Sequence, residues 1–182
     1  MATSAQTSES LRARLSDGSL AGHWTLAPSR SSATLASKSM WGLVPVKGTF
    51  RALEGGGTIS PAGEVTGSVA LGAESLDTKM KKRDAHLRSA DFFHSEKFPP
   101  ITFSVEKVVP AGEGVTVSGA LTVRDRSRQI SFPASVDMAG DGDITLDAAV
   151  AVDRSEFGLT WNQMGMASMK NTITVHAVFT KD

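Results

Sequence analysis

The sequence predicts an all-β protein, a closed antiparallel β-barrel of about eight strands that carries a short helical insertion. The first observation is composition, because 17 glycines and 7 prolines in 182 residues suit many short strands joined by tight turns. The second is hydropathy, because apolar and polar residues alternate along residues 101–106, 115–123, 130–138, 144–152 and 173–179. The third is the short spacing between these segments, which favours antiparallel hairpins over parallel βαβ units.

The chain is expected to have two parts, a flexible N-terminal arm over residues 1–21 and one barrel domain over residues 22–182. The arm is rich in Ser, Thr, Ala and Gln, and its helical-looking stretch from Leu11 to Leu15 is too short to be stable alone. Ordered structure is expected to begin at His23. Further strands are predicted over residues 33–39, 42–53 and 64–71, and turns over residues 110–114, 125–127 and 140–143.

Residues 75–94 interrupt the strand pattern and predict a helical excursion. Met80 and Leu87 fall near helical spacing, and Phe98-Pro99-Pro100 ends the excursion before the next strand. A long insertion between otherwise short connections is a candidate functional element.

Charge and residue counts exclude several classes of function. The chain has 19 basic and 19 acidic residues, so no broad field draws it to nucleic acid or to an anionic membrane, and any basic contact is expected to be local. It has no cysteine, and its four histidines lack metal-ligand spacing, so neither a metal nor another cofactor is expected. No apolar run is long enough for a spanning helix, and residues 1–22 lack the apolar core of a secretory signal. We therefore expect no stable membrane insertion and a cytoplasmic location.

A longer motif lies in and after the insertion. It reads Arg83-Asp84-x-His86-Leu87-Arg88-Ser89-x-Asp91-Phe92-Phe93, then Lys97-Phe98-Pro99-x-Ile101-x-Phe103, and it resembles the YceI-like family. Further matches are Trp24-x-Leu26, Val46-x-Gly48-x-Phe50 and Asp153-Arg154-x-x-Phe157-Gly158, so the resemblance spans about residues 22 to 180. It implies a lipocalin-like barrel that binds polyisoprenoid chains in an elongated internal pocket without catalysis. The family often has a His where this chain has Ser39.

The candidate ligand-binding residues combine this motif with aromatic and Met-rich segments. Apolar ligands need concave aromatic and aliphatic walls, Arg offers bidentate donors to a phosphate head group, and flexible Met side chains suit a gate at the barrel mouth. The candidates are Trp24, Phe50, Met80, Arg83, His86, Leu87, Phe92, Phe93, Phe98, Phe103, Trp161, Met164 and Met166.

Each group also has a purely structural interpretation. The aromatic rings can attach the insertion to the barrel, and the segment Trp161 to Met169 can be an exposed loop. Ion pairs between Arg83 and Asp84, or Arg88 and Asp91, can fix the insertion, and an Asp153–Arg154 pair can orient the last hairpins.

The resulting hypothesis is non-catalytic binding, storage or transport of a long isoprenoid, of the polyprenyl or isoprenoid-quinone type, in the barrel interior. The partner is a polyisoprenoid or similar amphiphilic lipid, and homodimerisation stays open. A ligand-free structural or protein-interaction barrel is the second reading, because side chains readily fill small barrels. The third is a lipid-modifying enzyme in which His86, with Asp84 or Asp91, acts on Ser89.

Overall fold

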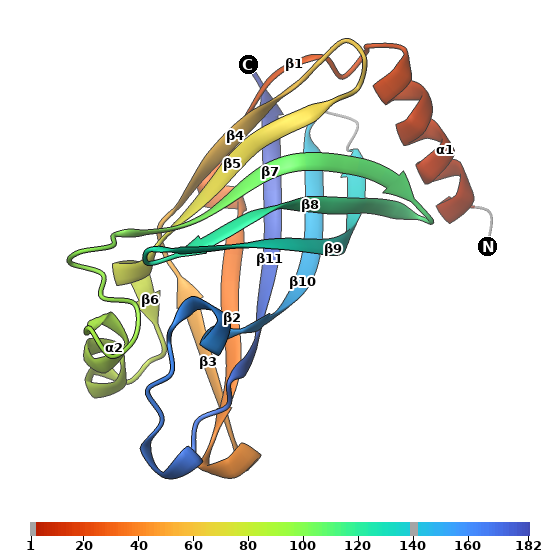
Figure 1. Ribbon diagram of the computed structural model, residues 1–182. Coiled ribbons are helices and arrows are strands. Elements are labelled where there is room, and N and C mark those ends of the chain that lie inside the picture. The colour runs from red at the N-terminus through yellow and green to blue at the C-terminus, as the bar shows by residue number, and fades with distance from the viewer. Residues whose placement is uncertain (1–2, 139–141) are drawn as a thin grey trace.

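The computed structural model describes residues 3–138 and 142–182. An antiparallel sheet curves into a barrel that α1 caps at the top of Figure 1, while α2 lies beside its lower part. The strands are β1 (Gly22–Leu26), β2 (Ser32–Ser39), β3 (Val44–Phe50), β4 (Leu53–Ile59), β5 (Val65–Gly72), β6 (Leu76–Asp77), β7 (Pro100–Ala111), β8 (Gly114–Val123), β9 (Arg126–Met138), β10 (Ile144–Asp153) and β11 (Lys170–Lys181). The helices are α1 (Thr3–Ser16) and α2 (Lys81–Arg88), with short 3₁₀ turns η1 (Pro28–Arg30), η2 (Met40–Gly42), η3 (Ala73–Ser75), η4 (Arg154–Phe157) and η5 (Gln163–Gly165).

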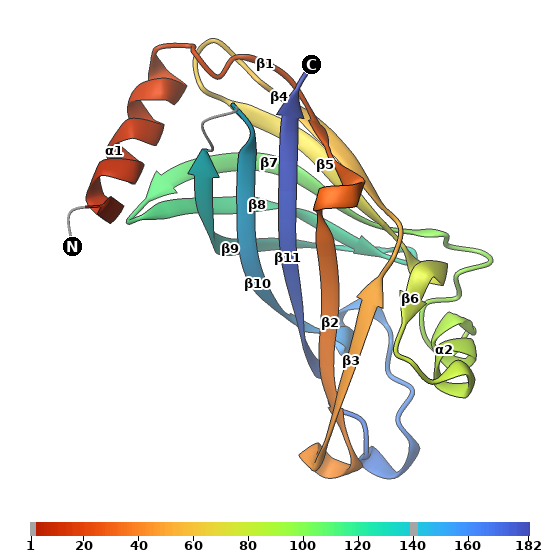
Figure 2. The same ribbon diagram turned by 180° about the vertical axis from the view of Figure 1, so that it is seen from behind.

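Eight strands close the ring in the order β1-β4-β5-β7-β8-β9-β10-β11, which confirms the predicted closed antiparallel barrel. Pairing of Leu26 in β1 with Phe179 in β11 completes the circle. The other half of β11 pairs with β2, for example Ala36 with Thr172, and β2 is followed in the sheet by β3 and β6. These three strands extend the wall below the ring, as Figure 2 shows from behind.

Alternation along the strands divides an apolar interior from a polar exterior. In β8 every second residue from Val115 to Val123 is buried. The buried residues form two clusters, one around Phe50, Leu76 and Phe157 near α2 and one around Trp24 near α1. The barrel therefore has two apolar ends with different surroundings.

The sequence did not predict β4 as a separate strand. The expected strand over residues 42–53 ends at Phe50, and β4 then starts at Leu53. Its centre, residues 55–57, is three glycines, so no apolar alternation marks it. These glycines serve close packing, because a Cβ on Gly67 of β5 would collide with the backbone of Gly56.

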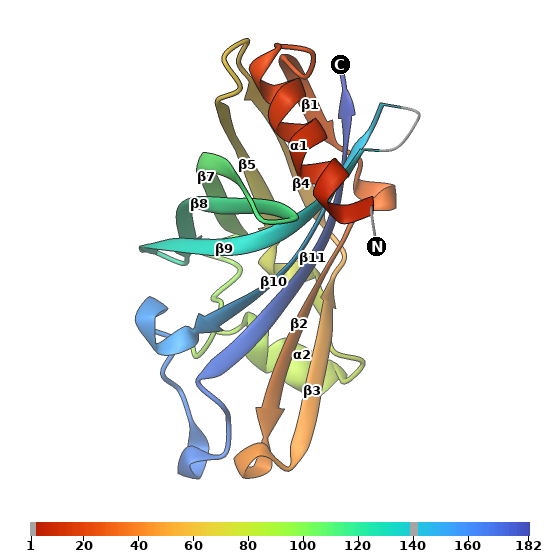
Figure 3. The ribbon, with the colours of Figure 1, turned by 90° about the vertical axis from the view of Figure 1, so that its right-hand side faces the viewer.

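The segment predicted to be a flexible N-terminal arm, residues 1–21, contains a helix in its described part. Residues 3–16 form α1, and Leu11, Leu15 and Leu20 are buried in the apolar cluster at the upper end of the barrel. The helix is stabilised by this packing, which local propensity does not reveal. Figure 3 shows α1 next to the upper strand ends.

The insertion is also less helical than predicted. Within residues 75–94, α2 covers only Lys81–Arg88, and the segment before it holds the short strand β6. The chain after α2 forms tight turns, in which His94 has a positive φ of 48°. Of the turn predicted at residues 140–143, positions 140 and 141 lie outside the described residues.

Candidate ligand-binding site

Three cavities lie in series inside the barrel, and we call them lower, central and upper after the orientation of Figure 1. Their volumes are about 260, 130 and 140 Å³, respectively. Neighbouring cavities share walls: the lower and central cavities have Ile101, Leu121 and Ile173 in common, and the central and upper cavities have Val69, Val105, Val117, Leu146 and Phe179 in common. The interior thus offers an elongated apolar space that runs from α2 to α1.

Charged side chains and histidine are confined to the lower cavity. Its lining includes Lys38, Arg83, His86 and Arg154, whereas the described residues that line the central and upper cavities include no charged side chain and no histidine. Most of its wall is nevertheless apolar, and Phe50 and Phe93 meet there edge to face with ring centroids 6.4 Å apart. This end suits the head group of an amphiphile, and the two deeper cavities suit its tail.

The start of α2 is fixed by a buried carboxylate. Asp84 accepts hydrogen bonds from the backbone N–H of Thr78, at 3.0 Å, and from the Thr78 hydroxyl. Arg83 then donates from Nε to Thr78 Oγ1 at 2.8 Å and from Nη2 to the Thr78 carbonyl at 2.9 Å. The Arg83–Asp84 ion pair proposed from the sequence is therefore replaced by shared bonding to Thr78, which holds Arg83 at the cavity wall.

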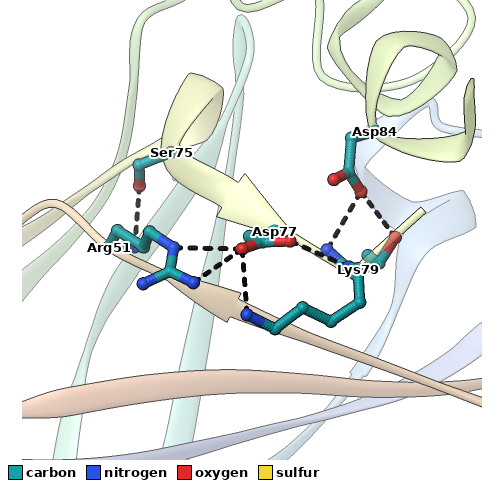
Figure 4. Close-up of polar contacts among 6 residues, drawn as sticks. Arg51, Ser75, Asp77, Lys79 and Asp84 are labelled. Atoms are coloured by element: carbon teal, nitrogen blue, oxygen red, sulfur yellow. Dashed lines mark hydrogen bonds and ion pairs between the residues drawn. The ribbon is translucent and has the colours of Figure 1, made fainter. Parts of the chain in front are cut away.

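A second carboxylate ties the same segment to the barrel (Figure 4). Asp77 accepts two hydrogen bonds from the Arg51 guanidinium, the shorter at 2.7 Å, and one from the backbone N–H of Lys79 at 2.8 Å. Arg51 first, and Lys79 after it, lower the pKa of Asp77 to about 2 from an ordinary value of 3.8. Ser75 accepts from the Arg51 backbone N–H at 3.1 Å. The approach to α2 is thus anchored on β3 and the residues that follow it.

His86 lies at the centre of the aromatic contacts around the lower cavity. Its ring packs edge to face against Phe92 at 5.1 Å and against Trp161 at 4.4 Å, while its Nε2 is 2.9 Å from Asp91 Oδ2. The Ser89 hydroxyl donates to the His86 carbonyl at 2.6 Å. The arrangement does not match a nucleophilic triad, in which the hydroxyl would donate to the imidazole.

Arg154 lines the lower cavity, whereas the sequence predicted for it an ion pair with Asp153. The residue is 8% exposed, and its guanidinium donates to the carbonyls of Ser168 at 3.0 Å, Leu159 at 2.7 Å and Trp161 at 2.8 Å. Burial lowers the pKa of this guanidinium, but arginine stays protonated in proteins. The expected Asp153–Arg154 pair is not formed as a direct contact, because Asp153 instead accepts from the N–H and hydroxyl of Ser155. Arg154 therefore holds the loop that frames the lower cavity.

The structure brings most of the thirteen predicted residues to the cavities. The lower cavity is lined by Phe50, Arg83, His86, Leu87, Phe92, Phe93 and Trp161. Trp24 lines the upper cavity and Phe103 the central one. These residues come from distant parts of the chain, yet they surround one continuous series of spaces.

Four predicted residues, all within the described ranges, line none of the three cavities. Met80 and Met164 are 54% and 76% exposed, and Met166 is only half-buried. Phe98 packs beside His94, with ring centroids 5.8 Å apart, and so belongs to the folding of the insertion. The Arg88–Asp91 pair is also replaced, because Arg88 donates to the Glu74 carbonyl and Asp91 contacts His86.

Other lining residues carried no recognisable signal. Leu11 and Leu15 of α1 line the upper cavity, which follows only from the docking of that helix. Ser39 lines the lower cavity as well. In residues 3–138 and 142–182 no three acidic or histidine side chains gather into a metal-binding group. Neither of the two α-helices in these ranges has the length and hydropathy needed to cross a bilayer.

The closed ring of strands and the apolar series of cavities inside it place the chain in the class of closed antiparallel β-barrels with an internal cavity. The sequence matches the YceI-like domain over residues 24–180, and the chain belongs to the YceI-like domain family. A curated relative, a UPF0312 protein of Enterobacter sp. (strain 638), is 35% identical over 97 residues, which cover 52% of this chain and 50% of the relative. The chain thus spans about half the length of that relative in the match.

Solved structures show the same fold. BcnA of Burkholderia cenocepacia superposes with a TM-score of 0.77 at 23% identity, over 85% of this chain and 99% of BcnA. A domain of Saccharophagus degradans described as polyisoprenoid-binding and implicated in plant cell wall breakdown gives a TM-score of 0.71 at 16% identity, over 87% and 98% of the two chains. At these identities the comparison supports the barrel architecture.

Proposed function

We propose that this protein binds a long isoprenoid, of the polyprenyl or isoprenoid-quinone type, inside the barrel and stores or transports it without altering it chemically. The observation that carries the proposal is the series of three apolar cavities with shared walls. The family membership supports it, as does the polyisoprenoid-binding description of the domain from Saccharophagus degradans.

The driving force is removal of the chain from water. Each buried CH₂ contributes about 0.8 kcal/mol, so a few isoprene units provide a large gross binding energy. Fixing a flexible chain and ordering the loops around it offsets part of this energy. The head group lies in the lower cavity near Arg83, His86 and Arg154, because the two deeper cavities have no charged lining to hold one.

Chain length is set at the upper end. There α1 covers the barrel through Leu11 and Leu15, and the Trp24 indole donates to the Leu20 carbonyl at 2.9 Å. A uniform apolar wall discriminates poorly between chains that differ by a methylene, at about 1 to 3 kcal/mol each. The side chains of α1 exclude any tail that would extend past them. The longest ligand that fits is therefore the one whose tail reaches α1.

The structure bears differently on the two alternatives. A purely structural barrel is expected to have its interior filled by side chains, and adjoining cavities of about 260, 130 and 140 Å³ argue against this alternative. A lipid hydrolase built on Ser89 lacks a hydroxyl directed at His86, since that hydroxyl donates to a backbone carbonyl.

Native mass spectrometry and lipid extraction of the purified protein test the proposal. Ile173 faces both the lower and the central cavity, so Ile173→Trp should block the passage and reduce polyprenol uptake about tenfold. Thr174→Trp makes a comparable addition on the exposed face of the same strand and should bind as the wild type does. If no lipid is recovered and the wild type takes up neither polyprenols nor quinones, the proposal is wrong.

A further inference from the structure

Exposed apolar side chains gather at one end of the molecule. Leu43, Met164 and Trp41 are 81%, 76% and 62% exposed, and Met40 and Val44 beside them are also exposed. Met40, Trp41 and Leu43 lie in the hairpin turn between β2 and β3, which contains η2, Val44 begins β3, and Met164 lies in η5. We call these five residues the apolar tip. Figures 1 and 3 show both loops at the bottom of the molecule, below the ring of the barrel.

The two loops are held together by the backbone. The N–H of Trp41 donates to the Met166 carbonyl at 3.1 Å, and the N–H of Ser168 donates to the Lys38 carbonyl at 2.9 Å. The apolar tip is therefore one surface built from parts of the chain that are far apart in sequence.

Backbone conformation at the tip is unusual for bulky residues. Met40, Trp41 and Met164 have φ values of 51°, 56° and 56° in the left-handed region. This region favours glycine and asparagine and costs other residues conformational energy. Large apolar side chains are thus placed in solvent on turns that disfavour them, which points to a binding role for this surface.

The two chain segments that carry the tip have charge of one sign, although the whole chain is neutral. Residues 31–53 include Lys38, Lys47 and Arg51 but no acidic residue, and residues 157–181 also lack one. Lys38 and Lys47 are exposed, and within the described ranges neither forms an ion pair. Apolar side chains between exposed lysines complement the anionic surface of a lipid bilayer.

The tip adjoins the polar end of the cavity series. Ser37, Lys38 and Ser39 lead into the β2–β3 turn and line the lower cavity, as do Ala167 and Ser168 after η5. A surface that touches a bilayer through the tip brings this cavity to the lipid interface. A stable interface with a second copy uses about 20 to 30 residues per partner, many more than the five of the apolar tip.

We propose that the apolar tip is a peripheral docking surface for anionic lipid bilayers, with Trp41, Leu43 and Met164 entering the interface and Lys38 and Lys47 contacting head groups. Docking itself does not depend on the isoprenoid function. The transfer of a ligand between bilayer and barrel does rest on that proposed function.

The test is co-sedimentation of lipid-free protein with vesicles of phosphatidylcholine and phosphatidylglycerol, and with vesicles of phosphatidylcholine alone. We expect binding to the anionic vesicles, weakening of this binding by salt, and a blue shift in tryptophan fluorescence that is lost when Trp41 is replaced. The double variant Trp41→Asn, Leu43→Ser should bind at least about tenfold more weakly. Asparagine tolerates the positive φ at position 41, so the turn is retained.

Two further variants separate the contributions to docking. Lys38→Glu, Lys47→Glu should lose the preference for anionic vesicles while retaining the apolar tip. Val109→Ser removes an exposed apolar residue, 41% exposed, from the α1 end of β7 and should bind as the wild type does. A thermal melt verifies that each variant is folded.

Several outcomes would overturn the docking proposal. They are absent binding to anionic vesicles, unchanged binding of the Trp41→Asn, Leu43→Ser variant, and an equal loss with Val109→Ser. A dimer in sedimentation velocity that this double variant abolishes, without vesicle binding, would assign the tip to a second copy instead. Uptake of polyprenol from solution is measured separately, and its failure would count against the isoprenoid function while leaving docking intact.

Discussion

The rings of His86 and Trp161 meet edge to face with centroids 4.4 Å apart at the lower cavity. His86 comes from α2 and Trp161 from the loop between η4 and η5, so this contact joins the two segments that frame the polar end. Phe92 completes the group, 5.5 Å from Trp161. The insertion and the loop are consequently one structure at the cavity wall.

This contact separates the binding and structural readings of the aromatic residues. Trp161→Ala removes a cavity wall that is 37% exposed, so we expect polyprenol affinity to fall about tenfold and the free energy of unfolding to fall by only about 1 kcal/mol. Isothermal titration calorimetry, which does not rely on tryptophan fluorescence, measures the affinity, and urea denaturation measures the stability. A large loss of stability with unchanged affinity would show that the ring serves only to attach the insertion.

Arg154 is expected to be important for stability. Arg154→Ala leaves the carbonyls of Leu159, Trp161 and Ser168 without their donor in a partly buried loop, and should cost about 2 to 4 kcal/mol. Urea denaturation measures this change. Arg128→Ala is the matched control, because Arg128 is exposed and, among the described residues, its side chain donates to the Ser127 carbonyl alone, at 3.4 Å. Equal effects of the two substitutions would contradict the role assigned to Arg154.

Alternation predicted the later strands well for a physical reason. In β8 one face is buried and the other is not, so apolar and polar residues alternate along most of the strand. In β4 the glycines at residues 55–57 serve close backbone approach, and they carry no side chain to alternate. The strand was therefore invisible to a pattern of side-chain polarity.

The remaining differences come from tertiary contacts. Leu11 and Leu15 are too few to predict a stable helix, but the upper barrel end supplies the apolar partners that bury them. Arg154 stands next to Asp153, which suggests an ion pair, yet its partners are backbone carbonyls that every sequence contains. Local residue types thus predicted much of the wall of the lower cavity. They did not predict that Arg154 is the hydrogen-bond donor that holds the neighbouring loop.

The low pKa of Asp77 predicts acid sensitivity with a defined sign. The pKa is about 2 in the folded protein and near 3.8 without its partners, so ionised Asp77 stabilises the fold above about pH 4. This contribution is lost as the pH falls from about 4 toward 2. Asp77→Asn should therefore be less stable than the wild type at neutral pH, and the two should converge in that window. Urea denaturation across this pH range measures the convergence.

Arg51→Gln provides the control for this pH dependence. It removes the hydrogen bonds from Arg51, which lower the pKa of Asp77 most. The pKa of Asp77 should therefore rise, and the free energy of unfolding should depend less on pH. A difference between wild type and Asp77→Asn that stays constant with pH would contradict the assignment.

The upper end of the cavity series gives a prediction about ligand length. Leu15 is 8% exposed and lines the upper cavity of about 140 Å³, so Leu15→Trp places an indole where the end of the tail would lie. We expect the retained polyprenols to shift toward shorter chains, with about tenfold less of the longest species, because steric exclusion at a closed end selects by length. Native mass spectrometry after loading with a mixture of chain lengths measures the distribution. Ala13→Trp is the control, because Ala13 is on the exposed side of α1 and should leave the distribution unchanged. Should Leu15→Trp retain the wild-type distribution while folding normally, the tail ends elsewhere and α1 does not set its length.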